Sequence, residues 1–167
     1  VMGYEGHLMM VHDRSERVHK VSAATAILLE AADRVGGDIV SGGGTGTFDS
    51  NTWCTEIQAG SYALMDTQYL ELDLPFECAL SVLATVISVN PKGWIVVDCG
   101  LKSLGMDHGN PSWSGGKVLF CSDEHTTLSP TELTDWKVGD RTRLLPAHVD
   151  PTVAKHQQMW VVDGDII

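Results

Sequence analysis

The sequence has little positive charge. Its 167 residues contain 11 lysines and arginines against 22 aspartates and glutamates, which gives a formal net charge of −11. A surface that binds nucleic acid neutralises phosphates with lysine and arginine, so this balance argues against a nucleic-acid partner. An anion bound by this chain would therefore be held by backbone N–H groups or by a metal ion.

Long apolar runs and clustered cysteines are also lacking. No stretch approaches the length of a membrane span, and no signal-peptide pattern opens the sequence. The four cysteines show no CxxC spacing, which favours free thiols in a reducing compartment. We therefore predict a cytoplasmic protein with no membrane partner. With 43% hydrophobic and 20% charged residues, the chain has enough apolar side chains for a globular core.

Secondary-structure patterns divide the chain into residues 1–72 and residues 73–167. In the first part, apolar spacing over residues 21–37 predicts a helix that ends at Gly36 and lies between short strands. This order indicates α/β structure with parallel strand pairing. In the second part, short runs rich in Val, Ile and Trp predict a mainly antiparallel β domain, a compact barrel or sandwich. The runs are residues 78–90, 93–100, 117–125, 138–148 and 158–167.

A glycine-rich loop, SGGGTGT, occupies residues 41–47 directly after a predicted strand. Its glycines allow close backbone approach, so that successive N–H groups and the hydroxyls of Thr45 and Thr47 could point at one anion. No lysine follows as in a Walker loop, and the pattern is not GxGxxG. The alternative interpretation is a tight loop without a ligand.

A histidine and an aspartate stand two residues apart in PAHVDPT, as His148 and Asp150. If the segment is an extended strand, both side chains project from one face. An imidazole and a carboxylate suit Mn²⁺, Mg²⁺ or Zn²⁺ and leave positions open for substrate. The alternative is a surface histidine followed by a turn that begins at Asp150-Pro151.

Several segments together resemble, in order and spacing, the C-terminal part of the metal-activated D-threonine aldolase and D-serine dehydratase family. They are GYEGH (3–7), VSGGGTGTF (40–48), TEIQAGSYALMD (55–66), VVDCGLKSL (96–104), DEHTTL (123–128) and PAHVDPTV (146–153). The resemblance implies a fold-type III pyridoxal phosphate enzyme similar to alanine racemase. Residues 1–72 would be the last strands of its (β/α)8 barrel, which binds the cofactor, and residues 73–167 its β domain.

The same resemblance implies a site and a reaction. The residues that it places at pyridoxal phosphate are Tyr4, Gly43, Gly44 and Thr45, with the glycine loop at the phosphate. His148 and Asp150 would bind the divalent metal. The implied enzyme is a homodimer that cleaves a D-β-hydroxy amino acid, a small molecule, to glycine and an aldehyde.

Asp150 bears on the branch of the family. The eukaryotic dehydratases have a cysteine where this chain has Asp150, so the resemblance favours an aldolase. A carboxylate also favours Mn²⁺ or Mg²⁺ over Zn²⁺, which remains possible. D-serine dehydratase and 3-hydroxy-D-aspartate aldolase are the alternatives within the family.

One departure from the family is serious. None of the six lysines lies in the motif of the Schiff-base lysine, and Lys102 matches a lysine of the β domain instead. We therefore expect the chain to be a fragment. Two other classes stay open: a racemase, which needs a tyrosine or cysteine of the β domain as a second base, and a truncated, non-catalytic interaction module.

Overall fold

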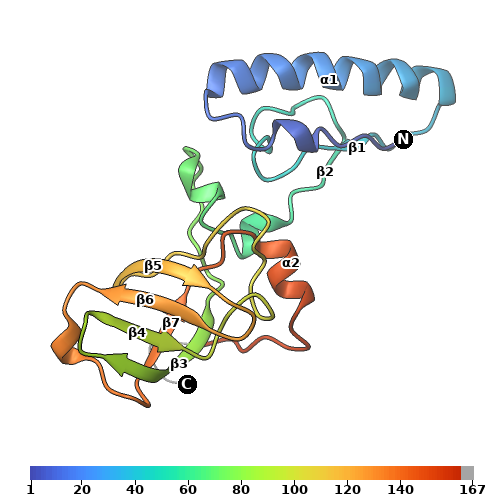
Figure 1. Ribbon diagram of the computed structural model, residues 1–167. Coiled ribbons are helices and arrows are strands. Elements are labelled where there is room, and N and C mark those ends of the chain that lie inside the picture. Colours follow the sequence, from blue (N-terminus) through green and yellow to red (C-terminus); the bar gives the residue numbers. More distant parts are fainter. Residues whose placement is uncertain (163–167) are drawn as a thin grey trace. The chain divides into compact units, whose positions relative to one another are not determined.

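The computed structural model describes residues 1–162, and the chain divides into two units, Val1–Ala79 and Leu80–Ile167 (Figure 1). The division falls a few residues after residue 72, where the sequence pattern changes. Residues 73–79 stay with the first unit, because the N–H of Ala79 donates to the carbonyl of Leu64 at 2.9 Å.

The long helix α1 (Arg14–Val35) has a capping residue at each end. The carboxylate of Asp13 accepts the backbone N–H of Glu16 at 2.7 Å, which satisfies one of the free donors of the first turn. Gly36 ends the helix with a φ of 78°, and its N–H donates to the carbonyl of Ala32. The predicted C-cap at Gly36 is confirmed, whereas the helix begins seven residues before the predicted start at residue 21.

The buried side of α1 differs from the predicted apolar face. Arg17, Val21 and Thr25 are the buried residues, spaced four apart, whereas Ile27 is 72% exposed. At about 100° per residue, Ile27 lies roughly 200° around the helix from Thr25 and therefore faces away from the unit. Ile27, although one of the apolar residues at helical spacing, is therefore not part of the buried side.

Two short parallel strands carry the glycine-rich loop. They are β1 (Ser41–Gly42) and β2 (Glu56–Ile57), with Ser41 opposite Glu56. Parallel pairing is confirmed, but β1 consists of the first two residues of the SGGGTGT segment, whereas the strand was predicted to end before it. The remaining elements of this unit are the 3-10 helices η1 (Gly6–Leu8), η2 (Ser61–Ala63) and η3 (Tyr69–Glu71).

The second unit contains a five-stranded antiparallel sheet with strand order β5-β6-β4-β3-β7 (Figure 1). The predicted antiparallel architecture is confirmed. The remaining helices of this unit are η4 (Leu133–Asp135) and α2 (Val149–Ala154). The strands are β3 (Val82–Asn90), β4 (Trp94–Val97), β5 (Gly116–Cys121), β6 (Thr126–Pro130) and β7 (Arg141–Leu144).

Three of the predicted runs end differently from the strands. The run 117–125 stops at Cys121, where a turn closed by the Ser122 N–H and the His125 carbonyl leads into β6, a strand that was not predicted. The run 138–148 contributes only β7, because the chain enters α2 directly after residue 148. Residues 158–162 form no strand, and residues 163–167 lie outside the described part.

The core of this unit lies against the sheet. Ile95 and Val97 alternate with half-buried neighbours along β4 and are fully buried with Val86, Leu128 and Leu144. Each such side chain contributes about 1.5–3 kcal/mol by leaving water. This core holds the sheet from which the loops of the candidate site extend.

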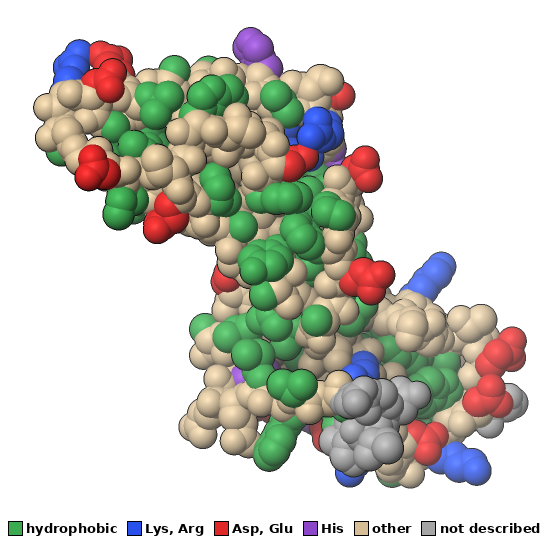
Figure 2. Space-filling model, turned by 180° about the vertical axis from the view of Figure 1, so that it is seen from behind, with side chains coloured by type: hydrophobic (Ala, Val, Ile, Leu, Met, Phe, Trp, Pro, Cys, Tyr) green, Lys and Arg blue, Asp and Glu red, His purple; other side chains and the backbone are tan. Residues whose placement is uncertain are grey.

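The surface reflects the composition. Acidic side chains are scattered over the face shown in Figure 2, and lysine and arginine form no continuous patch there among the described residues. None of the helices within residues 1–162 combines the length and the apolar character needed to span a bilayer.

Candidate active site

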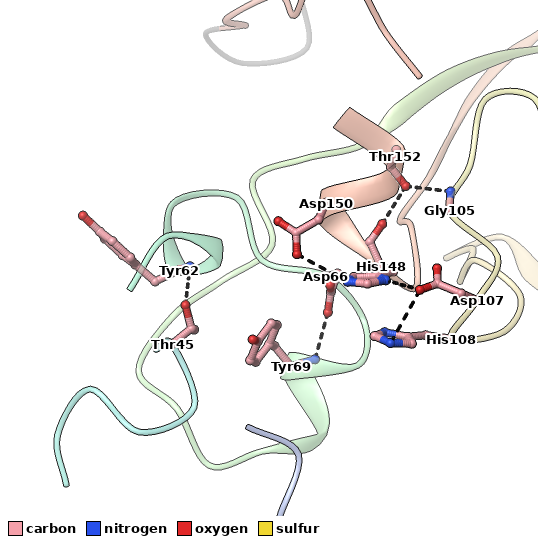
Figure 3. A network of polar contacts seen from close by, with 10 residues as sticks. All are labelled: Thr45, Tyr62, Asp66, Tyr69, Gly105, Asp107, His108, His148, Asp150 and Thr152. Atoms are coloured by element: carbon pink, nitrogen blue, oxygen red, sulfur yellow. Dashed lines mark hydrogen bonds and ion pairs between the residues drawn. The ribbon is translucent and has the colours of Figure 1, made fainter. Parts of the chain in front are cut away.

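His148 and Asp150 lie at the start of α2 (Figure 3). His148 is the N-cap residue, with extended dihedrals of φ −142° and ψ 119°, and Asp150 belongs to the first helical turn. The prediction that both residues lie in one strand is therefore wrong. The two side chains still meet, with His148 Nε2 3.3 Å from Asp150 Oδ2, because the imidazole extends from a residue outside the helix.

Two further residues of the β domain contact His148, and the sequence analysis missed both. Asp107 Oδ2 lies 2.6 Å from Nδ1 of His148, and the ring of His108 stacks on the His148 ring with centroids 3.8 Å apart and planes 12° apart. Asp107, His108 and His148 each offer one atom that could bind a metal, a carboxylate oxygen or an imidazole nitrogen, and these three atoms lie within 4.8 Å of one another. The only signal in the sequence was an adjacent aspartate and histidine in a loop, MDHGN, far from residue 148.

A buried threonine joins the two segments of this cluster. The Thr152 hydroxyl donates to the His148 carbonyl at 2.7 Å and accepts the Gly105 N–H at 2.9 Å (Figure 3). A side chain at Gly105 has no room, since a Cβ there would lie 2.4 Å from Pro151 Cγ. The loop that carries Asp107 is thus held against the first turn of α2.

The imidazoles of this cluster keep the carboxyl group of Asp107 ionised. Desolvation raises the pKa of Asp107, but the hydrogen bond from His148 and the charges of the His148 and His108 imidazoles outweigh it. The pKa of Asp107 therefore lies below its ordinary value, and at neutral pH this side chain is a carboxylate that accepts a hydrogen bond from Nδ1 of His148.

The glycine-rich loop is organised from inside by a buried carboxylate. Glu5, 6% exposed, accepts the Gly43 N–H at 3.1 Å, the Thr47 hydroxyl at 2.8 Å and the Asn51 side-chain amide at 3.1 Å. The Gly44 N–H donates to the Thr47 hydroxyl oxygen at 3.1 Å. The Gly43 and Gly44 N–H groups, which the family resemblance placed at a phosphate, thus have partners within the first unit. Glu5 was not among the predicted site residues.

The other predicted residues of this region lie close together. A Cβ on Gly44 would approach the Tyr4 ring to 2.8 Å, and the Tyr4 side chain is 54% exposed. The Thr45 hydroxyl accepts the Tyr62 N–H at 3.0 Å (Figure 3). The backbone N–H groups of Thr45 and Gly46 have no hydrogen-bond partner within residues 1–162. The free donors of the loop are therefore those of Thr45 and Gly46.

Comparison with known proteins assigns the chain to a family. The family model described as a putative serine dehydratase domain matches residues 79–162, about half of the chain. The chain belongs to this serine dehydratase domain family. The match includes Asp107, His108, His148 and Asp150 and covers all five strands of the sheet.

Comparison with a curated relative extends the similarity to the first unit of this chain. The chain is 35% identical to 3-hydroxy-D-aspartate aldolase from Paracoccus denitrificans (strain Pd 1222), over 97% of this chain and 46% of that protein. The chain spans about half the length of this relative and of the D-threonine aldolase from Arthrobacter that it also matches. The predicted resemblance to the C-terminal part of the aldolase and dehydratase family is confirmed.

Solved structures agree in fold. The crystal structure of D-threonine aldolase from Filomicrobium marinum has a TM-score of 0.83 and 33% identity, covering 93% of this chain and 46% of that one. An alanine racemase-like protein from Idiomarina loihiensis has a TM-score of 0.77 at 24% identity, covering 93% of this chain and 50% of that one. The predicted fold class, the end of an alanine racemase-like barrel followed by an antiparallel β domain, is confirmed.

Proposed function

We propose that this chain is part of a pyridoxal phosphate- and divalent metal-dependent lyase that cleaves D-β-hydroxy amino acids to glycine and an aldehyde. Two proteins that are 35% and 33% identical to this chain are named as such aldolases. The observation that carries the proposal is the pair His148 Nε2 and Asp150 Oδ2, 3.3 Å apart at the start of α2. A homodimer is part of the same proposal.

The His148–Asp150 pair fits a divalent ion. Two ligand atoms that each lie about 2.1 Å from one ion, at an angle of 90–109°, are about 3.0–3.4 Å apart. The separation of 3.3 Å between Nε2 and Oδ2 falls within this range. Asp150 is 73% exposed, so the remaining positions of the ion face solvent and are open to a substrate oxygen. A carboxylate ligand favours Mn²⁺ or Mg²⁺.

The glycine loop fits the phosphate of pyridoxal phosphate at Thr45 rather than at Gly43. The consecutive N–H groups of Thr45 and Gly46 lack internal partners, and consecutive free amides form an anion site. The Gly43 N–H points to the Glu5 carboxylate, whose negative charge opposes a phosphate at the same place. Gly43 and Gly44 then shape the loop, and Tyr4 lies beside it.

The chemistry follows from these placements. Bound pyridoxal phosphate would supply an electron sink, and a bound divalent ion a Lewis acid that makes the substrate hydroxyl more acidic. His148 and Asp150 would hold that ion and thereby keep the substrate hydroxyl in one place and orientation.

The racemase alternative finds no suitable second base in the second unit. All three tyrosines, Tyr4, Tyr62 and Tyr69, precede residue 80. Burial raises the pKa of Cys99 to about 12 and also raises the pKa of Cys78 and of Cys121. None of these thiols is therefore an effective base at neutral pH. The aldolase proposal accordingly has more support than a racemase.

Metal binding by the 167-residue chain tests the proposal. Titration with Mn²⁺, followed by electron paramagnetic resonance of the free ion, should show one bound ion. We expect His148→Ala and Asp150→Ala each to weaken binding about tenfold or more, because each removes a ligand. Asp123→Ala, an exposed aspartate of the same unit, is the control for the lost charge. Unchanged Mn²⁺ affinity in His148→Ala would overturn the assignment of the metal.

Activity of the complete gene product separates the remaining alternatives. With D-threonine, an aldolase releases glycine and acetaldehyde, a dehydratase releases a keto acid and ammonia, and a non-catalytic module shows neither product nor cofactor absorbance. We expect chelation to lower cleavage by about a thousandfold, since a Lewis acid supplies several kcal/mol of the barrier reduction. Normal cleavage in the chelated protein would contradict the proposal.

A further inference from the structure

We infer that Asp107 is a positioning residue for the metal: it holds the proton of His148 on Nδ1 and so leaves the Nε2 lone pair free toward Asp150. The inference rests on the proposed function, because it concerns the same metal pair. It adds a residue that lies more than forty positions earlier in the sequence, in the loop between β4 and β5.

The distances separate the roles of the two carboxylates. The 2.6 Å between His148 Nδ1 and Asp107 Oδ2 is a hydrogen-bond length, and it is shorter than the roughly 3.0–3.4 Å expected for two atoms that bind one ion. The 3.3 Å between Nε2 and Asp150 Oδ2 is long for a charge-assisted hydrogen bond and suits two ligands of one ion. Asp107 thus accepts a hydrogen bond from the Nδ1–H group of His148, and Asp150 would share the ion.

In its neutral form, the one able to bind a metal through nitrogen, the imidazole of His148 has one proton for its two nitrogens. Both nitrogens of His148 face a carboxylate, so Asp107 and Asp150 compete for that proton. The shorter contact is to Asp107, which places the proton on Nδ1 and the lone pair on Nε2. Such a carboxylate on the far nitrogen orients a metal-binding histidine and makes it a stronger ligand.

The surroundings hold this arrangement in place. The His108 ring covers one face of the His148 ring, and the Thr152 hydroxyl ties the His148 carbonyl to Gly105, two residues before Asp107. Rotation of the imidazole would lose both the stacking and the 2.6 Å contact (Figure 3). The ring therefore presents Nε2 to Asp150 before any ion arrives.

Mn²⁺ affinity of the 167-residue chain is the first measurement. Asp107→Ala should weaken binding by about 10- to 100-fold, the usual effect of losing such an outer partner. Asp107→Asn keeps an oxygen that accepts the Nδ1 proton, so it should recover most of the affinity, with a loss below about tenfold. Asp123→Ala removes the same charge from the same unit without touching an imidazole, and it should bind Mn²⁺ as the wild type does.

The tautomer of His148 is the second measurement, and it needs no metal. In ¹⁵N-histidine-labelled protein at about pH 8, where an ordinary imidazole is neutral, long-range ¹⁵N correlations report which nitrogen carries the proton. The wild type should show the proton on Nδ1. Asp107→Ala should move it to Nε2, because Asp150 is then the remaining acceptor. His148→Gln assigns the signal by its disappearance.

The outcomes distinguish this inference from the proposed function. If His148→Ala and Asp150→Ala leave Mn²⁺ affinity unchanged, the proposed metal pair fails. If those two variants lose affinity while Asp107→Ala keeps it and the Nδ1 tautomer, the positioning role alone is overturned. If Asp107→Asn binds as poorly as His148→Ala, Asp107 is a direct ligand in a site formed with His108, which also overturns the positioning role.

Discussion

The glycine-rich loop of the first unit and the His148 cluster of the second unit each depend on a carboxylate, but the two carboxylates have opposite roles. Glu5 is buried and accepts hydrogen bonds from three donors of its own unit, and these bonds stabilise the conformation of the glycine-rich loop. Asp107 is half exposed and accepts one imidazole N–H, which leaves the other nitrogen of His148 free to bind a ligand.

This difference separates a carboxylate that builds the fold from one that prepares a site. Removing a buried acceptor leaves its donors without partners and without water, so the loss appears in stability. Removing an exposed acceptor lets water replace it, so the loss appears in the orientation of its partner. Glu5 variants should therefore alter the free energy of unfolding, and Asp107 variants should alter metal binding.

Glu5→Ala is the variant with the largest expected effect on stability. It leaves the Gly43 N–H, the Thr47 hydroxyl and the Asn51 amide without their acceptor, and each buried unpaired donor costs about 1–3 kcal/mol. We expect the free energy of unfolding of the first unit to fall by about 3 kcal/mol or more. Helical ellipticity in urea measures it, because α1 is the long helix of this chain.

Glu30→Ala is the matched control for Glu5→Ala. Glu30 is exposed on α1 and pairs with Arg34 one turn later. Such exposed pairs contribute little, so the unfolding free energy should change by less than about 0.5 kcal/mol. Equal effects of Glu5→Ala and Glu30→Ala would show that the Glu5 network does not hold the loop.

Thr152→Val is expected to have an intermediate effect on the other unit. It removes the hydroxyl between the Gly105 N–H and the His148 carbonyl while keeping the shape of the side chain. The second unit should lose about 2 kcal/mol, because two buried polar groups lose their partner. Tryptophan fluorescence in urea reports it, since four of the five tryptophans follow residue 80.

Thr152→Ser retains the hydroxyl but lacks the methyl group, so it separates the contribution of the hydrogen bonds from that of methyl packing. It should keep the Mn²⁺ affinity of the wild type, whereas Thr152→Val should weaken it by releasing the loop that carries Asp107. Weaker binding in both variants would mean that the threonine methyl group, and not the hydrogen bonds, positions the loop.

The sequence predicted the fold class correctly, but it did not predict every strand or the buried face of α1. Alternation along β4 and the Gly36 cap are local signals, and both have their physical cause in neighbouring residues. β6 was missed because its sequence, TTLSP, has none of the Val, Ile and Trp residues that marked the other runs, although it forms a local hairpin with β5. The burial of Arg17 in place of Ile27 depends on what packs against α1, which helical periodicity does not specify.

The site shows the same limit. The pairing of His148 with Asp150 was predicted, though from a strand that is in fact the start of a helix. Asp107 was not found, because its contact with His148 joins two loops 41 residues apart. Glu5 was quoted within GYEGH, but only the folded loop shows that its carboxylate takes the Gly43 N–H assigned to a phosphate.

Thr45→Val has the smallest expected stability effect apart from the Glu30→Ala control, and it tests the part of the glycine loop that Glu5 does not hold. The Thr45 hydroxyl oxygen accepts the Tyr62 N–H at 3.0 Å, so its removal leaves one partly buried donor unpaired. We expect a loss of about 1 kcal/mol in the helical ellipticity transition, well below that of Glu5→Ala. Thr45→Ser keeps the oxygen and should restore most of this loss. If Thr45→Val instead matches Glu5→Ala, the loop unfolds as one cooperative network, and the distinction between its Glu5-bound half and its free Thr45–Gly46 amides does not hold.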